Sequence, residues 1–91
     1  MKIYKYAIEL ADGVTGHMMP TKAKILSVGL DGNDEVCVWM LVDETLATKE
    51  TRFFRIYGTG WDIHKEKIEF IGTVPMKKNY LIWHVFEVLP K

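Results

Sequence analysis

The sequence predicts an all-β fold, with six to seven short antiparallel strands arranged as a meander-like small barrel or sandwich. Two observations support this fold. Apolar segments of strand length recur along the chain, and turn residues separate them at intervals of about 8 to 12 residues. No linker, repeat or low-complexity segment interrupts the pattern. Residues 1–91 are therefore expected to form a single β domain.

The first part of the chain predicts two strands joined by a tight turn. Residues 2–10 alternate in polarity, as in a strand with one buried face. The Asp12-Gly13 pair predicts a hairpin turn, because glycine accepts the positive φ that such turns require. A short returning strand is expected over residues 15–19. It should end at Pro20, which cannot donate a hydrogen bond to a neighbouring strand.

The segment 36–42 is the most apolar strand, and the rest of the chain is expected to pack around it. Both of its faces are apolar, with Val36, Val38, Met40 and Val42 on one and Cys37, Trp39 and Leu41 on the other. Such a strand is expected at the centre of a sheet with both faces covered. Cys37 is expected to be a small buried residue, since a lone cysteine forms no internal disulfide.

Residues 23–30, just before this central strand, are also rich in Ile, Leu and Val. A two-turn helix is the alternative here, but Gly29 and the Asp31-Gly32-Asn33 turn favour a strand that forms a hairpin with residues 36–42. Leu26 and Val28 are expected to pair with the central strand.

The second half of the chain predicts three more strands. Residues 51–57 alternate so that one face is apolar and the other mixed, aromatic and basic, with Phe53, Arg55 and Tyr57 on the mixed face. A glycine-hinged loop over residues 58–64 follows. Further strands are expected over residues 68–74, ended by Pro75, and over residues 80–89, which again have two apolar faces.

Composition and charge exclude several classes of partner. The chain has 12 Lys and Arg against 12 Asp and Glu, so no net charge attracts it to nucleic acid or to an acidic membrane surface. Its N-terminal residues alternate in polarity, unlike a signal peptide or a membrane span. We expect no strong nucleic-acid binding, no membrane association and a cytoplasmic location.

Two strands that are apolar on both faces are more than one small sheet domain needs. The excess of apolar strand surface predicts a homo-oligomer in which part of this surface is covered by another copy of the chain. Aromatic residues concentrate in such interfaces. The expected interface residues are Trp39, Trp83 and Phe86.

Four segments together resemble a family of small uncharacterised proteins encoded by tailed bacteriophages and prophages. They are AKILSVGLDGNDEVCVWMLVD, FRIYGTG, IGTV and WHVFEV, and the resemblance covers nearly the whole chain. Relatives tend to read His-Pro-Ile after YGTG, whereas this chain has Trp61-Asp62-Ile63. The resemblance carries no established activity and no functional residues. It implies a phage-encoded accessory protein in the cytoplasm of the infected host cell.

The strongest candidate for a binding site is the loop after the mixed-face strand, residues 57–64. Its glycines let the backbone approach a bound group, successive amides can surround an anion, and Trp61 offers a flat surface for a base. The alternative is a plain hairpin connection in which Trp61 covers the core. Arg55 shares a strand face with Tyr57 and can pair with phosphate. The candidate ligand-binding residues are Arg55, Tyr57, Thr59, Gly60, Trp61 and His64.

No catalytic residue, metal site or cofactor is expected. The three histidines, His17, His64 and His84, show no metal-binding spacing, and His84 is expected in the core or an interface. Ser27 lacks the glycine-flanked motif of a nucleophilic serine, and Cys37 lies inside a strand rather than at a helix start.

These observations predict a non-catalytic phage accessory protein that antagonises a host function by binding. In the more specific version, the site captures a nucleotide-type signal at an oligomer interface. One alternative is a protein-binding inhibitor of a host defence enzyme, which would use an apolar sheet face or a strand edge. Another is a small virion component.

Overall fold

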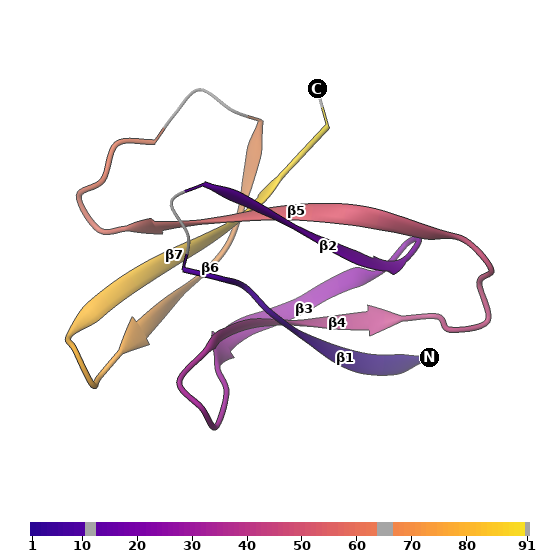
Figure 1. Ribbon diagram of the computed structural model, residues 1–91, viewed down its shortest axis with the longest axis horizontal. Helices are drawn as coiled ribbons and strands as arrows, with labels where there is room; N and C mark the ends of the chain where they lie inside the picture. The colour runs from indigo at the N-terminus through magenta and orange to yellow at the C-terminus, as the bar shows by residue number, and fades with distance from the viewer. Residues whose placement is uncertain (11–12, 64–66, 91) are drawn as a thin grey trace.

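The protein is built entirely from β-strands and turns in the residues that the computed structural model describes, which are 1–10, 13–63 and 67–90. Seven strands follow one another along the chain (Figure 1). They are β1 (Lys2–Ala7), β2 (Val14–Pro20), β3 (Lys24–Leu30), β4 (Val36–Val42), β5 (Lys49–Gly58), β6 (Ile68–Met76) and β7 (Leu81–Val88). Nowhere in the described chain does a helix have the length and apolar character needed to cross a membrane.

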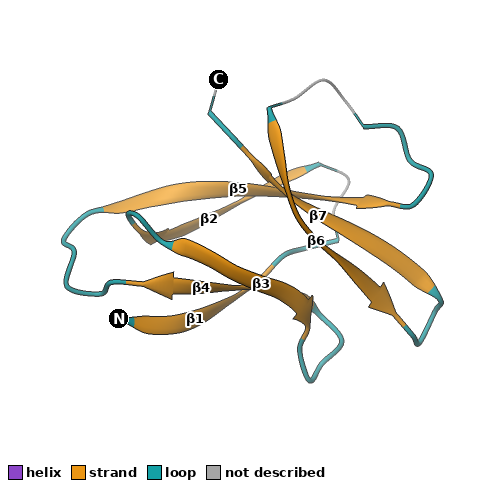
Figure 2. Ribbon diagram, turned by 180° about the vertical axis from the view of Figure 1, so that it is seen from behind, coloured by secondary structure: helices purple, strands orange, loops and turns teal. Residues whose placement is uncertain are grey.

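The strands form two antiparallel sheets that pack against each other. One has three strands in the order β1-β4-β3, and the other has four in the order β2-β5-β7-β6. Figure 2 shows the two layers from behind, and β3 of the three-stranded sheet lies close to β6 of the other sheet. No ladder joins the two sheets in the described ranges, so the fold is an open sandwich and not a closed barrel. The predicted all-β class is confirmed.

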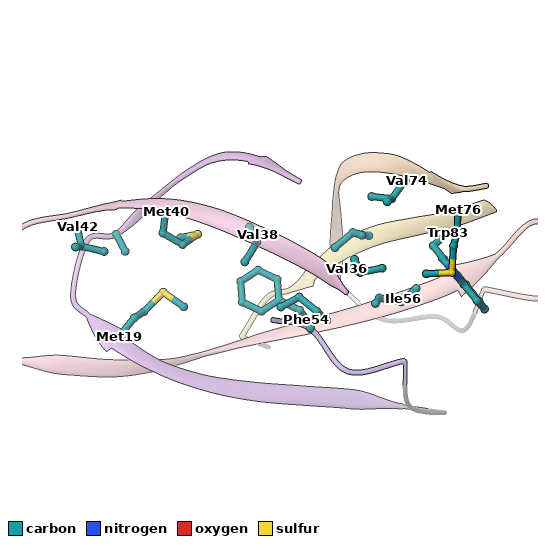
Figure 3. Packing of buried hydrophobic residues seen from close by; sticks show 13 residues of the cluster. Met19, Val36, Val38, Met40, Val42, Phe54, Ile56, Val74, Met76 and Trp83 are labelled. Carbon is teal, nitrogen blue, oxygen red and sulfur yellow. The ribbon is translucent and has the colours of Figure 1, made fainter. Parts of the chain in front are cut away.

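Apolar side chains from both sheets meet between the layers and form the core. Figure 3 shows Val36, Val38, Met40 and Val42 of β4 facing Phe54 and Ile56 of β5. Met19, Val74, Met76, Trp83 and Val85 complete most of this layer. Because side chains alternate along a strand, every second residue of β4, β5 and β7 points inward, as their polarity patterns predict.

The predicted hairpin between the first two strands is wrong. β1 pairs with β4, with Tyr6 opposite Val38, whereas β2 pairs with β5 in the other sheet, with Thr15 opposite Phe54. The chain therefore crosses between the layers after β1, and the strand order is not that of a meander. Each of the two strands covers a free edge of a long apolar strand, which a local hairpin would have left unpaired.

The predicted hairpin of residues 23–30 with the central strand is confirmed. β3 pairs with β4, and Val28 lies opposite Val38. Leu26 was expected to pair as well, but the register shifts between Ile25 and Ser27, so that Leu26 lies in a bulge.

Residues 36–42 do form the central strand of a sheet, but only one face of β4 is covered by the other layer. Val36, Val38, Met40 and Val42 are buried there, whereas Trp39 and Leu41 on the outer face are only half-buried. Trp39 lies across Gly29 on the neighbouring strand. Cys37 is buried as expected. The outer face therefore keeps apolar surface that the domain itself does not cover.

Pro75 does not end its strand, contrary to the prediction, because β6 continues to Met76 with Pro75 opposite Ile82. β6 lies at the edge of the four-stranded sheet. A strand at an edge pairs on one side only, so the missing N–H of proline leaves no neighbour without a donor.

The β3–β4 turn is organised by the Asp31 carboxylate. It accepts hydrogen bonds from the backbone N–H groups of Asn33 and Glu35, each at 2.9 Å, and pairs with Lys5 Nζ at 3.0 Å. The Glu35 N–H, followed by Lys5, lowers the pKa of Asp31 from 3.8 to about 2. Deprotonation of this carboxyl therefore favours the folded state.

We expect this turn to make folding stability depend on pH in the acid range. Since the pKa of Asp31 is lowered by folding, its contribution is complete above the ordinary pKa of 3.8 and is lost as the pH falls through about 2. Asp31→Asn should lower the melting temperature at neutral pH and flatten the loss of stability across this window. Thermal melts of both proteins from pH 5 to pH 2 measure it. Asp34→Asn, which changes an exposed carboxylate of the same turn, is the control, and equal slopes for all three proteins would contradict the assignment.

Candidate functional site

A tight turn at the end of β5 positions the candidate loop. The Trp61 N–H donates to the Gly58 carbonyl at 3.1 Å, and Gly60 takes a φ of 89°, which suits glycine. The turn folds the Trp61 indole back onto the end of its own strand. Because the Trp61 amide is used within the turn, the predicted run of free amides around an anion loses one of its donors.

The indole fits there because residue 58 has no side chain. A Cβ at Gly58 would lie 2.8 Å from Cε2 and 2.9 Å from Nε1 of Trp61, closer than real Cβ atoms come. The indole also makes an edge contact with Trp83, with ring centroids 5.7 Å apart and planes at 79°. Trp61 is therefore held in place although 54% of it is exposed.

The loop and the outer face of the four-stranded sheet line an open pocket of about 240 Å³, here called the Tyr57 cavity. It brings together four of the six predicted ligand-binding residues, Tyr57, Thr59, Gly60 and Trp61. Gly58 and Ile63 of the same loop also line it, and its remaining walls are Phe70 of β6 and His84 and Phe86 of β7. The cavity is lined mainly by aromatic and apolar side chains, as small-molecule sites usually are.

His84 is the polar centre of this cavity. Its Nε2 lies 2.7 Å from Thr59 Oγ1, and its Nδ1 lies 3.0 Å from Thr73 Oγ1. Both ring nitrogens are therefore engaged by hydroxyl groups, which can donate or accept. The threonines fix the ring plane, so that His84 presents a fixed ring face to a bound molecule.

Tyr57 lies beneath the cavity with its ring fixed and its hydroxyl unpaired. Phe86 packs edge-on against the ring at 5.5 Å, and the Arg55 guanidinium lies 5.0 Å from the ring centroid. Tyr57 is 3% exposed, and its buried hydroxyl has no hydrogen-bond partner among the described residues. A buried hydroxyl without a partner is costly, and a ligand group that bonds to it recovers that cost.

A second cavity, of about 260 Å³, lies on the other side of the loop and is here called the Trp83 cavity. It shares Gly58, Thr59 and Trp61 with the first, and its other walls are Tyr80, Leu81, Ile82 and Trp83. The β6–β7 turn that carries Tyr80 lies at the same end of the sheet as the loop after β5 (Figure 1). Trp83 is 9% exposed, and its buried indole N–H has no partner in the described chain.

The remaining predicted site residues lie elsewhere. Arg55 shares the outer face with Tyr57, as expected, but it contacts the Tyr57 ring and does not line the cavity. His64 lies outside the described residues. Of the expected interface residues, Trp39 lies on the outer face of the three-stranded sheet and Phe86 in the Tyr57 cavity. Trp83 belongs to the core cluster, and it also lines the Trp83 cavity.

Two larger hollows, of about 480 and 500 Å³, lie at the opposite end of the four-stranded sheet. Both are lined by the ion pair of Arg52 and Glu87. Arg52 is already occupied, because its Nη2 donates to Glu87 at 3.0 Å and its Nη1 to the Ala23 carbonyl at 2.7 Å. These bonds raise the pKa of Arg52, with the hydrogen bond to Glu87 as the main cause. The pair connects the two layers, and its hydrogen-bonding groups are not available to a ligand.

We expect Gly58→Ala to move Trp61 away from Trp83, because the added methyl group would occupy the space of the indole. Near-ultraviolet circular dichroism, which reports on fixed aromatic contacts, should lose intensity. Gly32→Ala is the matched control, since a Cβ there meets no atom within 4 Å. An unchanged spectrum for Gly58→Ala would show that the indole does not depend on this contact.

Comparison with known families gives one match over the full chain. The model described as Domain of unknown function (DUF7352) matches residues 1–91. Neither the curated proteins nor the solved structures contain a significant match.

Proposed function

Because the chain belongs to the DUF7352 family, whose function is unknown, we propose from its own geometry that it is a non-catalytic binding protein. Its ligand is a flat nucleotide-type molecule, and the site is the Tyr57 cavity. The observation that carries this proposal is the gathering of Tyr57, Trp61, Phe86 and His84 around one small cavity. Aromatic side chains give a base stacking surfaces, and a polar group in an apolar cavity fixes its orientation.

The proposal includes a biological context that rests on sequence resemblance alone. A phage accessory protein that binds a nucleotide-type signal removes it from the host pathway that reads it. Such a protein acts in the cytoplasm of the infected cell and needs no catalytic group. The neutral net charge fits a small ligand better than a long nucleic acid, for which many positive charges are needed.

Thermal-shift screening against linear and cyclic nucleotides tests the proposal. A ligand at 100 times its dissociation constant stabilises the folded state by about 2.7 kcal/mol, which raises the melting temperature of a domain of this size by roughly 10 to 20 °C. Trp61→Ala should abolish the shift. Phe53→Leu, which changes an exposed aromatic of the same strand outside both cavities, should keep it. A melting temperature that no nucleotide moves would reject the proposal.

A protein partner is the second candidate, and the exposed outer faces favour it. Phe53 and Phe70 are exposed on the four-stranded sheet, and Ile3 and Leu26 on the three-stranded sheet. Apolar side chains exposed on a sheet face are a feature of contacts between proteins. Co-purification from host lysate separates the candidates, since only a protein inhibitor should retain a stoichiometric host protein.

We also propose that copies of the chain associate through the outer face that carries Trp39. Half-buried Trp39 and Leu41 are flanked there by exposed Ile3. Light scattering at micromolar concentration should give a mass above that of one 10.6 kDa chain, and Trp39→Glu should return it to that value. A monomeric mass for the unmodified protein would reject this part of the proposal.

A further inference from the structure

The two cavities at the end of the four-stranded sheet are neighbours that share Gly58, Thr59 and Trp61. Their volumes are similar, about 240 and 260 Å³. Each is below the roughly 300 Å³ at which drug-sized binding pockets begin. Each is thus suited to one small ring system, and Trp61 belongs to both.

Each cavity is also lined by a residue whose buried polar atom has no partner in the described part of the chain. For the Tyr57 cavity this residue is Tyr57, with its hydroxyl, and for the Trp83 cavity it is Trp83, with its indole N–H. Tyr57 is 97% buried and Trp83 91% buried, from exposed fractions of 3% and 9%. Buried polar groups are nearly always paired, so two such groups beside adjacent cavities point to a ligand that bonds to both.

We propose that the two cavities form a single two-part site for a dinucleotide, with one base in each cavity and the Trp61 indole shared between them. This inference rests on the proposed nucleotide-binding function and deepens it, because it names the class of nucleotide. A mononucleotide fills only one cavity and satisfies only one of the two buried groups.

The two buried groups differ in whether they donate or accept hydrogen bonds, and this determines which group each base needs. The Trp83 N–H only donates, so the base in its cavity presents a ring nitrogen or a carbonyl oxygen. The Tyr57 hydroxyl donates or accepts, so its cavity takes a base with either kind of group. An aliphatic side chain of a peptide has neither group and would leave both atoms unpaired. This favours nucleotide bases over an apolar peptide at these two positions.

The surroundings of the Trp83 cavity suit the rest of a dinucleotide. Tyr80 is 92% exposed at its rim and offers a second stacking surface. Lys77 and Lys78 are exposed in the same turn and carry positive charge, which attracts phosphate groups. Both unpaired atoms are shielded from water, so a ligand reaches them only when neighbouring side chains move. Trp61 lines both cavities, so its fluorescence is expected to change on binding.

Isothermal titration calorimetry tests the inference with matched ligands. The panel consists of dinucleotides with adenine, guanine, cytosine or uracil in both positions, and of the four mononucleotides. At least one dinucleotide should bind at one per chain and at least tenfold more tightly than its mononucleotide, because the second base binds intramolecularly. Tyr57→Phe and Trp83→Phe should each weaken that dinucleotide about tenfold, which corresponds to one lost buried hydrogen bond.

Two further variants, Tyr80→Ala and Phe53→Leu, distinguish a loss of dinucleotide binding from a failure to fold. Tyr80→Ala changes an almost fully exposed side chain, so it should fold normally, weaken the dinucleotide and leave a mononucleotide in the Tyr57 cavity unaffected. Phe53→Leu should bind like the unmodified protein. A mononucleotide that binds at one per chain as tightly as its dinucleotide would overturn the two-part site and leave the proposed function standing. Binding of no nucleotide at all would overturn both.

Discussion

Replacing Arg52 by methionine is expected to destabilise the domain by about 3 kcal/mol, because removal of one partner of a buried ion pair leaves the other charge without compensation. Glu87 is 7% exposed and receives two hydrogen bonds from Arg52, through Nε and Nη2. The Ala23 carbonyl loses its donor as well. A domain of this size has about 5 to 15 kcal/mol in total, so much of its stability depends on this contact. Urea denaturation followed by circular dichroism measures the loss.

The double variant Arg52→Met with Glu87→Leu is the control for this prediction. Replacing both charges by apolar groups removes the need for a partner, and such exchanges are often nearly neutral. The double variant should therefore be more stable than Arg52→Met alone. If it is equally unstable, the packing of the Arg52 side chain, and not the charge of Glu87, holds the two layers together here.

For this ion pair, the sequence predicts the strand face of Arg52 but not its partner. Alternation along residues 51–57 placed Arg52 on the same face as Phe54 and Ile56, which is the core face, and this is where the structure has it. A charge on a core face demands a partner. The partner lies 35 residues later, on a strand whose pairing with β5 no local pattern specifies.

The predicted pairing of the first two strands was wrong for the same reason, since their true partners are distant in sequence. Alternating polarity tells which residues of a strand face the core, but not which strand lies beside it. Residues 2–7 and 14–20 have good strand patterns, and the turn signal between them favoured the nearest pairing. In the structure, β1 pairs with the edge of β4 and β2 pairs with the edge of β5. Both pairings join residues that are distant in sequence.

The part of the candidate site that is contiguous in sequence could be predicted. The part that comes from other strands could not. Tyr57, Thr59, Gly60 and Trp61 stand within five positions of one another, and their types indicated a binding loop. His84 comes 25 residues after Thr59 and reaches it only because β7 pairs with β5, with Tyr57 opposite His84. The sequence held one indication that His84 belongs to the site, because His84 and Phe86 share a strand face with apolar neighbours. The cavity on the other side of Trp61 was not predicted, because its other walls come from the β6–β7 turn and the start of β7, which are distant from the loop in sequence.

Phe54→Ala is expected to cost about 3 to 5 kcal/mol of folding stability, the range for removing a large aromatic side chain from a core. Phe54 is completely buried between the two sheets and faces the β4 valines (Figure 3). At about 4 to 8 °C for each kcal/mol, the melting temperature should fall by at least about 12 °C, and part of the population should be unfolded at 37 °C.

Phe53→Ala is the matched control, because it removes the same side chain from the adjacent residue. Phe53 lies on the opposite face of β5 and is 46% exposed, so the change leaves no cavity in the core. Its cost should stay near 1 kcal/mol or below, as for most surface substitutions. Similar losses for the two variants would mean that the outer face of the four-stranded sheet is itself covered, which self-association through that face would cause. Unequal losses at every protein concentration would instead show that one layer of core, formed by the inner faces alone, supplies the stability of the domain.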